Sequence, residues 1–157
     1  MQRLRWVFSI VTALAIAAPA AAAGPAAVVV PVLWQPPSCP HDKLGQVSIQ
    51  VGTRVNESTR DLLVPTVDYD RAFAKLATAA QAIGADAVVV RWHQATYFSR
   101  NKRRSHTPVH VQLRGAAIRT HADAGPCSFA RVDPLDFEQR ARSAQPVEVN
   151  SRDAYRD

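Results

Sequence analysis

The chain has few of the residues that define several protein classes. Among its 157 residues are two cysteines, one methionine and six glycines, and aromatic residues make up 7%. Two cysteines are too few for a disulfide-rich miniprotein, and no C-x-x-C pair suggests a thiol redox centre. The composition also excludes a collagen-like chain and a coiled coil. The length leaves room for one domain with appendages, which excludes a large multidomain enzyme.

Acidic residues are scarce relative to basic ones. Asp and Glu number 13 against 19 Lys and Arg, which gives a formal net charge of +6. A basic chain favours anionic partners, such as lipid head groups, cell-wall polymers or acidic proteins. No nucleic-acid-binding motif is recognisable, so nucleic acid is not an expected partner.

The first 23 residues have the pattern of a secretory signal peptide. Arg3 and Arg5 supply the positive start, residues 6–17 form an uncharged apolar stretch, and alanines at residues 20–23 suit a signal peptidase. We therefore expect cleavage near residue 23 and a periplasmic or secreted protein without a transmembrane segment. The alternative is a retained membrane anchor, for which the apolar stretch is only just long enough.

Cys39 and Cys127 are expected to form a disulfide, because two cysteines in an exported chain usually pair. The bridge would close a loop of about 89 residues, which is worth ~4–5 kcal/mol in the chain-entropy view. It would tie the start of the folded region to its end. The alternative, a thiol pair for redox or metal chemistry, lacks the usual spacing.

Composition divides the mature chain into three parts. Residues 24–43 are rich in proline and form a linker or an edge segment. Residues 44–128 carry the regular apolar patterns and form the domain. Residues 129–157 form a polar C-terminal tail, in which residues 134–144 are compatible with a short surface helix.

The first two elements of the domain are a strand and a helix. Val47, Ile49 and Val51 alternate with polar residues, which predicts a half-buried strand over residues 44–51. A helix begins after an N-cap at Asp68 or Asp70 and ends before Gly84. Its buried stripe is expected to contain Tyr69, Phe73, Leu76, Ala80 and Ile83.

Two further strands complete the expected fold. Residues 85–93 alternate so that Val88, Val90 and Trp92 share one face while His93 lies on the other. A second strand covers residues 109–119, where Gly115 allows a close approach of another backbone or of the helix. A charged connection over residues 99–107 suits an antiparallel hairpin. The predicted class is α+β, with one helix packed on a small antiparallel sheet in the order strand, helix, strand, strand.

Three short motifs stand out within residues 39–120: Gly-Ala-Asp-Ala-Val-Val at residues 84–89, Gly-Ala-Ala-Ile at residues 115–118, and the Leu-Gly-x-Val pattern that begins at Leu44. In these motifs the chain resembles small bacterial domains of the YbjQ-like type and their exported relatives, which include the outer-membrane sensor of the Rcs envelope-stress phosphorelay. It implies the α+β fold and a sensor-like role in the envelope. The sensor-type relatives are lipoproteins with two disulfides, whereas this chain has one cysteine pair and no lipid-attachment motif. No catalytic residue is implied.

The charged connection is the most distinctive candidate site. Arg100, Lys102, Arg103 and Arg104 place four cations within five residues, and Tyr97 and His106 flank them. Arginine forks bind phosphates and carboxylates, and nearby aromatic rings can stack on a ligand. The alternative is a solvated hairpin tip whose charges prevent aggregation at the sheet edge.

The histidines offer weaker candidates. His93 and His110 are expected on comparable faces of paired strands, but no metal-ligand spacing such as H-x-x-x-H occurs, so no metal or other cofactor is expected. A small hydrolase that uses the His106/His110 region is the alternative function, although no G-x-S-x-G motif accompanies it. Asp86 is expected to cap backbone amides.

Together these patterns predict an exported, non-enzymatic domain of the cell envelope that binds a partner or acts as a sensor-like accessory. The partner is expected to be an envelope protein or an anionic envelope polymer or lipid, docked on the basic hairpin. A purely structural envelope protein is a further alternative. The oligomeric state is left open by the sequence.

Overall fold

The computed structural model of the protein describes residues 29–55, 64–121, 125, 127–144 and 147–150. The elements are β1 (Val32–Leu33), β2 (His41–Gly52), α1 (Tyr69–Gln81), β3 (Ala87–Arg100), β4 (Arg103–Arg104), β5 (His110–Thr120), α2 (Pro134–Ser143) and β6 (Val147–Asn150). The predicted signal peptide over residues 1–23 lies outside the described residues. Neither of the helices in the described part of the chain has the length and apolar composition needed to cross a membrane.

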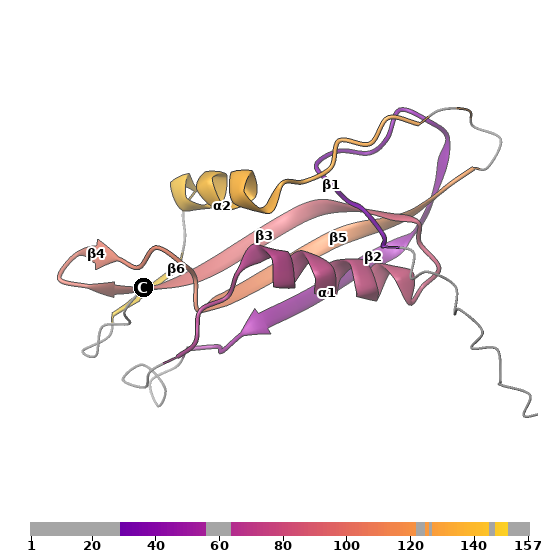
Figure 1. The fold of residues 1–157 in the computed structure, drawn as a ribbon. Helices are drawn as coiled ribbons and strands as arrows, with labels where there is room; N and C mark the ends of the chain where they lie inside the picture. Colours follow the sequence, from indigo (N-terminus) through magenta and orange to yellow (C-terminus); the bar gives the residue numbers. More distant parts are fainter. Residues whose placement is uncertain (1–28, 56–63, 122–124, 126, 145–146, 151–157) are drawn as a thin grey trace, which may run out of the picture.

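All six strands belong to one sheet in which β3 has the most neighbours. The order is β1-β3-β5-β2, and β4 and β6 also pair with β3 (Figure 1). β5 runs antiparallel to both β2 and β3, whereas β1 and β6 run parallel to β3. The α+β class is confirmed. The expectation of one helix on an antiparallel sheet needs correction, because the terminal segments add two parallel strands and a second helix.

Helix α1 begins where the sequence predicts. The Asp68 carboxylate accepts a hydrogen bond of 2.7 Å from the amide of Arg71, which satisfies one of the free N–H groups at the helix start. Gly84 follows the helix with φ +77°, in the left-handed region that glycine adopts without strain. The buried residues are Tyr69, Ala72, Phe73, Leu76, Ala77 and Ala80. Ile83 was expected among them but is 45% exposed, because the helix has already ended.

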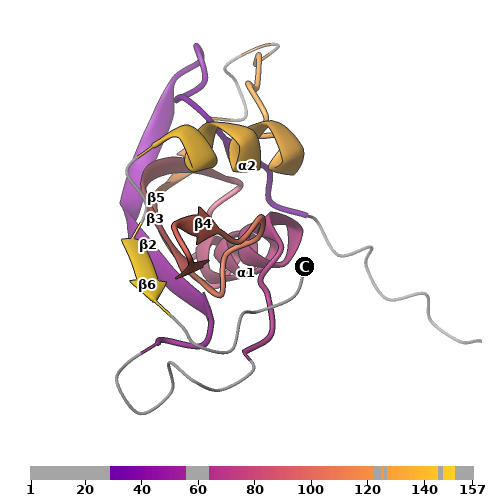
Figure 2. The same cartoon turned by 90° about the vertical axis from the view of Figure 1, so that its left-hand side faces the viewer.

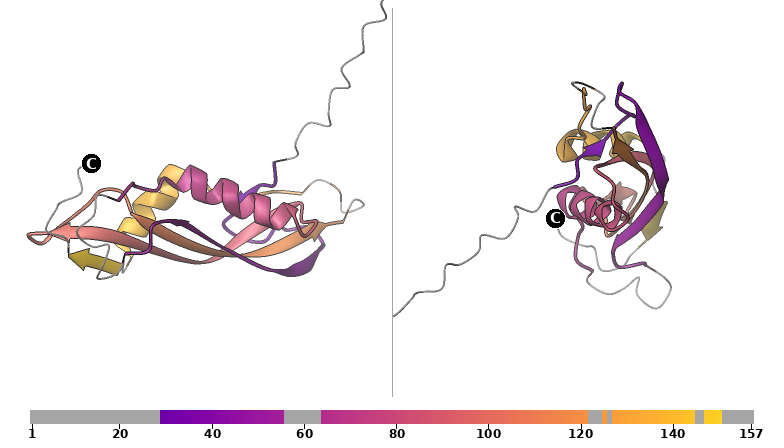
Figure 3. Two further views of the ribbon diagram at one scale, coloured as in Figure 1. Left: turned by 90° about the horizontal axis from the view of Figure 1, so that it is seen from below. Right: turned by 90° about the vertical axis from the view of Figure 1, so that its right-hand side faces the viewer.

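Both helices lie against the same face of the curled sheet, as Figures 2 and 3 show. We call this the inner face and the opposite one the outer face. Phe137 and Ala141 of α2 are buried in the same core as Phe73 and Leu76 of α1. The segment predicted as a polar tail therefore contributes apolar side chains to the core.

A β-bulge in β3 decides which side chains face the helices. The register with β5 shifts between Val90 and Trp92, so Arg91 is an extra residue. Beyond the bulge, Trp92 pairs with Arg114 on the outer face, and His93 faces the core. The simple alternation predicted the reverse, because one inserted residue moves every later side chain to the other face.

The disulfide between Cys39 and Cys127 is present, with Cα atoms 5.5 Å apart and a sequence separation of 88 residues. It connects the segment before β2 with the segment before α2. Next to it, the amide of Trp34 donates to the carbonyl of Ala130 at 3.0 Å. The proline-rich segment is thus held against the chain that leads into α2.

Removal of the disulfide should lower stability. We expect the Cys39→Ser/Cys127→Ser variant to have a free energy of unfolding about 4–5 kcal/mol below that of the oxidised protein, because the bridge restricts the unfolded chain. Urea unfolding monitored by circular dichroism measures this difference. An unchanged value would show that the bridge contributes nothing to folding.

Gly115 should not tolerate a side chain. A Cβ atom at this position would lie 2.6 Å from Cγ2 of Val88, 3.2 Å from the carbonyl oxygen of Val89 and 3.5 Å from Cδ2 of Leu76. We expect Gly115→Ala to lower the free energy of unfolding by about 1–3 kcal/mol through this overpacking. Combination with Val88→Ala should cost less than the sum of the two single changes. Strict additivity would contradict the proposed clash.

Candidate functional site

The basic residues of the predicted site lie on a tight hairpin, not on a long loop. β3 extends to Arg100 and β4 begins at Arg103, which leaves Asn101 and Lys102 as the turn. Their φ values of 51° and 64° are those of a type I′ turn, which matches the twist of a two-stranded hairpin. Lys102 and Arg103 are exposed, and the hairpin forms one end of the sheet (Figure 1). The side chain of Arg100 lies outside the described part.

Arg104 points into the molecule and anchors the hairpin. Its Nη2 donates to the carbonyl of Arg142 at 2.7 Å, its guanidinium lies 5.0 Å from the ring centroid of Tyr97, and Nη1 lies 3.8 Å from a carboxylate oxygen of Glu148. In return, Nε of Arg142 donates to the carbonyl of His106 at 2.7 Å. These contacts join the hairpin to the end of α2. Arg104 is therefore a structural residue of the site.

Tyr97 was expected to flank a ligand, but it is completely buried. Its hydroxyl has no hydrogen-bond partner in the described part of the chain. Burial raises the pKa of Tyr97. Tyr97 has no surface to offer a ligand, whereas His106 is exposed.

His93 and Tyr69 form a polar pair inside the apolar core. The Tyr69 hydroxyl lies 2.7 Å from Nε2 of His93, and the ring of Phe137 packs against both, with centroids 5.3 Å and 5.0 Å away. Burial lowers the pKa of His93 to about 4 and raises the pKa of Tyr69. Both groups are neutral at pH 7, so the pair suits a hydroxyl that donates to an unprotonated ring nitrogen.

The other expected histidine pair does not form. His110 pairs with Thr96 on the outer face, whereas His93 faces the core, so the two histidines are on opposite faces. His110 is 4% exposed, and burial together with the charge of Arg54 lowers its pKa. Among the residues that the structure describes, no group of three His, Cys, Asp or Glu side chains could hold a metal ion.

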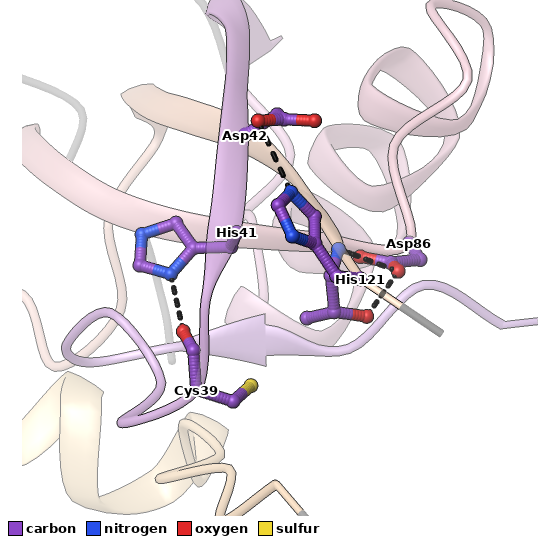
Figure 4. A network of polar contacts seen from close by, with 6 residues as sticks. Cys39, His41, Asp42, Asp86 and His121 are labelled. Carbon is purple, nitrogen blue, oxygen red and sulfur yellow. Dashed lines mark hydrogen bonds and ion pairs between the residues drawn. The ribbon is translucent and has the colours of Figure 1, made fainter. Parts of the chain in front are cut away.

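Two further histidines lie near the disulfide (Figure 4). Nδ1 of His41 lies 2.8 Å from the carbonyl oxygen of Cys39, and Nε2 of His121 lies 3.2 Å from a carboxylate oxygen of Asp42. These contacts connect the start of β2 with Cys39, which precedes it, and with His121, which follows β5. The His121–Asp42 pair is exposed, so its contribution to stability is small.

Asp86 has the capping role that the sequence predicts. Its carboxylate accepts hydrogen bonds from the Thr120 amide, at 2.9 Å, and from the Thr120 hydroxyl (Figure 4). These hydrogen bonds join Thr120, the last residue of β5, to the residue that precedes β3. Asp86 therefore stabilises this end of the sheet.

In the His106/His110 region, where the alternative hydrolase site was predicted, the nearby serines have structural contacts or are buried. The Ser105 hydroxyl donates to the carbonyl of Thr107 at 3.0 Å, and Ser99 is 5% exposed. His110 is buried on the outer face of the sheet.

Reasoning from the sequence missed the exposed centre of the outer face. There the guanidinium of Arg114 lies 4.7 Å from the ring centroid of Trp92. Gln50, Gln112 and Gln94 occupy one row across β2, β5 and β3. The alternating glutamines of the strands were a usable signal, but the bulge at Arg91 concealed that Trp92 shares their face.

Comparisons with protein-family models, with characterised proteins and with solved structures found no significant match. The resemblance to YbjQ-like domains therefore stays a prediction. The function has to be argued from the chemistry of the described surface.

The Tyr69–His93 pair should make stability depend on pH. Burial lowers the folded-state pKa of His93 from 6.5 to about 4, so the unfolded chain binds a proton at this side chain at a higher pH than the folded protein does. The contribution of neutral His93 to the free energy of unfolding is therefore complete above pH 6.5 and is lost as the pH falls towards 4. We expect the stability difference between the wild type and His93→Gln to fall by up to about 3 kcal/mol over this interval. Chemical unfolding at a series of pH values measures it. A difference that does not change with pH would show that His93 is not held neutral.

Proposed function

We propose that the protein is an exported, non-enzymatic domain of the cell envelope that docks an anionic partner on its basic hairpin, as a binding or sensor-like component. Export is supported by the disulfide, since such bridges persist in oxidising compartments. It is also supported by the signal-peptide pattern of residues 1–23. The expected partner is an envelope protein or an anionic polymer or lipid.

The observation that carries this proposal is the construction of the hairpin. The hairpin presents Lys102 of the turn and Arg103 of β4 to solvent, while Arg104 contacts Tyr97 and the carbonyl of Arg142. A short hairpin that is anchored at its base loses little conformational entropy when it binds a partner. Exposed cations held in this way can steer an anionic partner to one end of the sheet.

The alternatives have less support. A hydrolase at the His106/His110 region would need a nucleophile beside a general base, whereas Ser105 donates to a backbone carbonyl and His110 is buried. A purely structural role explains Arg104 and is compatible with exposed charges that protect the sheet edge, but it assigns no partner to the clustered cations Lys102 and Arg103. The docking function therefore accounts for more of the hairpin.

The hairpin can be tested by removal of its exposed charges. We expect Lys102→Ser/Arg103→Ser to lose an anionic partner that the oxidised wild type retains from an envelope extract at physiological salt. The fold should be unchanged, because both side chains are exposed and surface changes usually cost little. Pull-down followed by mass spectrometry measures the loss.

A matched control is Arg71→Ser/Arg131→Ser, which removes the same net charge at two exposed positions outside the hairpin. This control should retain the partner. Equal recovery by the wild type and the hairpin variant, or equal loss in both variants, would contradict docking at the hairpin.

A further inference from the structure

The outer face carries two polar rows across its three long strands. One row consists of Gln50, Gln112 and Gln94, and the adjacent row of Ser48, Arg114 and Trp92. We call these six residues the outer patch. Strand spacing gives each row a span of about 10 Å and separates the two rows by about 7 Å along the strands. The six side chains therefore form a small array on the outer face of the curled sheet.

The outer patch is open to solvent. Along β3 it lies between residues of two small buried clusters, since Ala87 and Val89 belong to one and Phe98 to the other. Between them Trp92 is 38% exposed, and Arg114 is exposed. Both helices lie on the opposite side of the sheet (Figure 3).

The charge of this surface has one sign. Across β2, β3 and β5 the only acidic residue is Asp42, which lies beside His121. Arg114 belongs to the outer patch itself, and Arg54 adjoins it, with its guanidinium 3.5 Å from the side-chain oxygen of Gln50. An anionic ligand would therefore meet cations without opposing carboxylates in these rows.

We infer that the outer patch binds a linear acidic glycan. Three glutamine amides can both donate to and accept from hydroxyl groups. Trp92 offers an apolar ring surface to the C–H groups of a sugar ring. The Arg114 guanidinium, stacked on Trp92 at 4.7 Å, can direct its forked donors at a carboxylate.

A glycan fits this chemistry better than a protein does. The centre of a protein–protein interface is depleted in charged residues and more apolar than the surrounding surface. Here the centre is Gln112 and Arg114, and Trp92 is the one large apolar side chain of the six. The site is separate from the hairpin, so the inference does not depend on the proposed hairpin docking.

The test uses oligogalacturonate, a linear chain with one carboxylate per sugar ring, and its methyl ester, which has the same backbone without charge. We expect the purified, oxidised wild type to bind the acid in isothermal titration calorimetry. Arg114→Gln should weaken binding of the acid by about tenfold or more, since a charge-assisted hydrogen bond is lost, and should leave binding of the ester unchanged. Trp92→Ala should weaken both.

Two control variants keep the result interpretable. Arg71→Gln on α1 removes one exposed charge elsewhere, and Lys102→Ser/Arg103→Ser alters the hairpin; each should change affinity by about twofold at most. Circular dichroism and urea unfolding show that each variant is folded. Gln50→Ala/Gln94→Ala provides a second probe of the patch without a change of charge or of Trp92.

Three outcomes would overturn the inference. The first is that neither oligomer binds at millimolar concentration. The second is that Arg71→Gln weakens binding as much as Arg114→Gln does. The third is that poly-glutamate of the same charge binds more tightly than the oligogalacturonate and is lost in Arg114→Gln, which would assign the outer patch to acidic proteins.

Discussion

The backbone pairing of β3 is the constraint on which the rest of the structure depends. This strand of 14 residues pairs with other strands on both of its edges. Thr96, for example, pairs with a residue of β5 on one edge and with a residue of β6 on the other. Segments from both ends of the described chain reach the sheet through it, since β1 and β6 both run parallel to β3. A long strand without these partners would leave many buried N–H and C=O groups unpaired, which is costly.

Helix α2 connects the core with the hairpin. On one side, Phe137 packs on Tyr69 and His93, and its ring lies 5.0 Å from that of Trp34. At its other end, the helix accepts a hydrogen bond from Arg104 through a backbone carbonyl. The position of the basic turn is therefore linked to the packing of the core, as the docking role that we propose for it would require.

The elements that the sequence predicted well are those with local signals. Asp68 as the N-cap and Gly84 after the helix follow from backbone requirements that a short stretch of residues reveals. The Cys39–Cys127 bridge follows from the cysteine count and from the predicted signal peptide. The strands β1 and β6 and the burial of α2 were harder to predict from the sequence. Their few apolar residues, such as Phe137, acquire meaning only against partners distant in the sequence.

For the candidate site, the sequence determined the presence of clustered cations on a hairpin and the alternation of glutamines along the strands. The tertiary structure decided which cations are exposed, because the contact between Arg104 and the end of α2 is made 38 residues away. It also decided the faces of Trp92 and His93, because the bulge at Arg91 arises from pairing with β5. Local pattern fixes which side chains are available, whereas pairing between distant segments determines where they point.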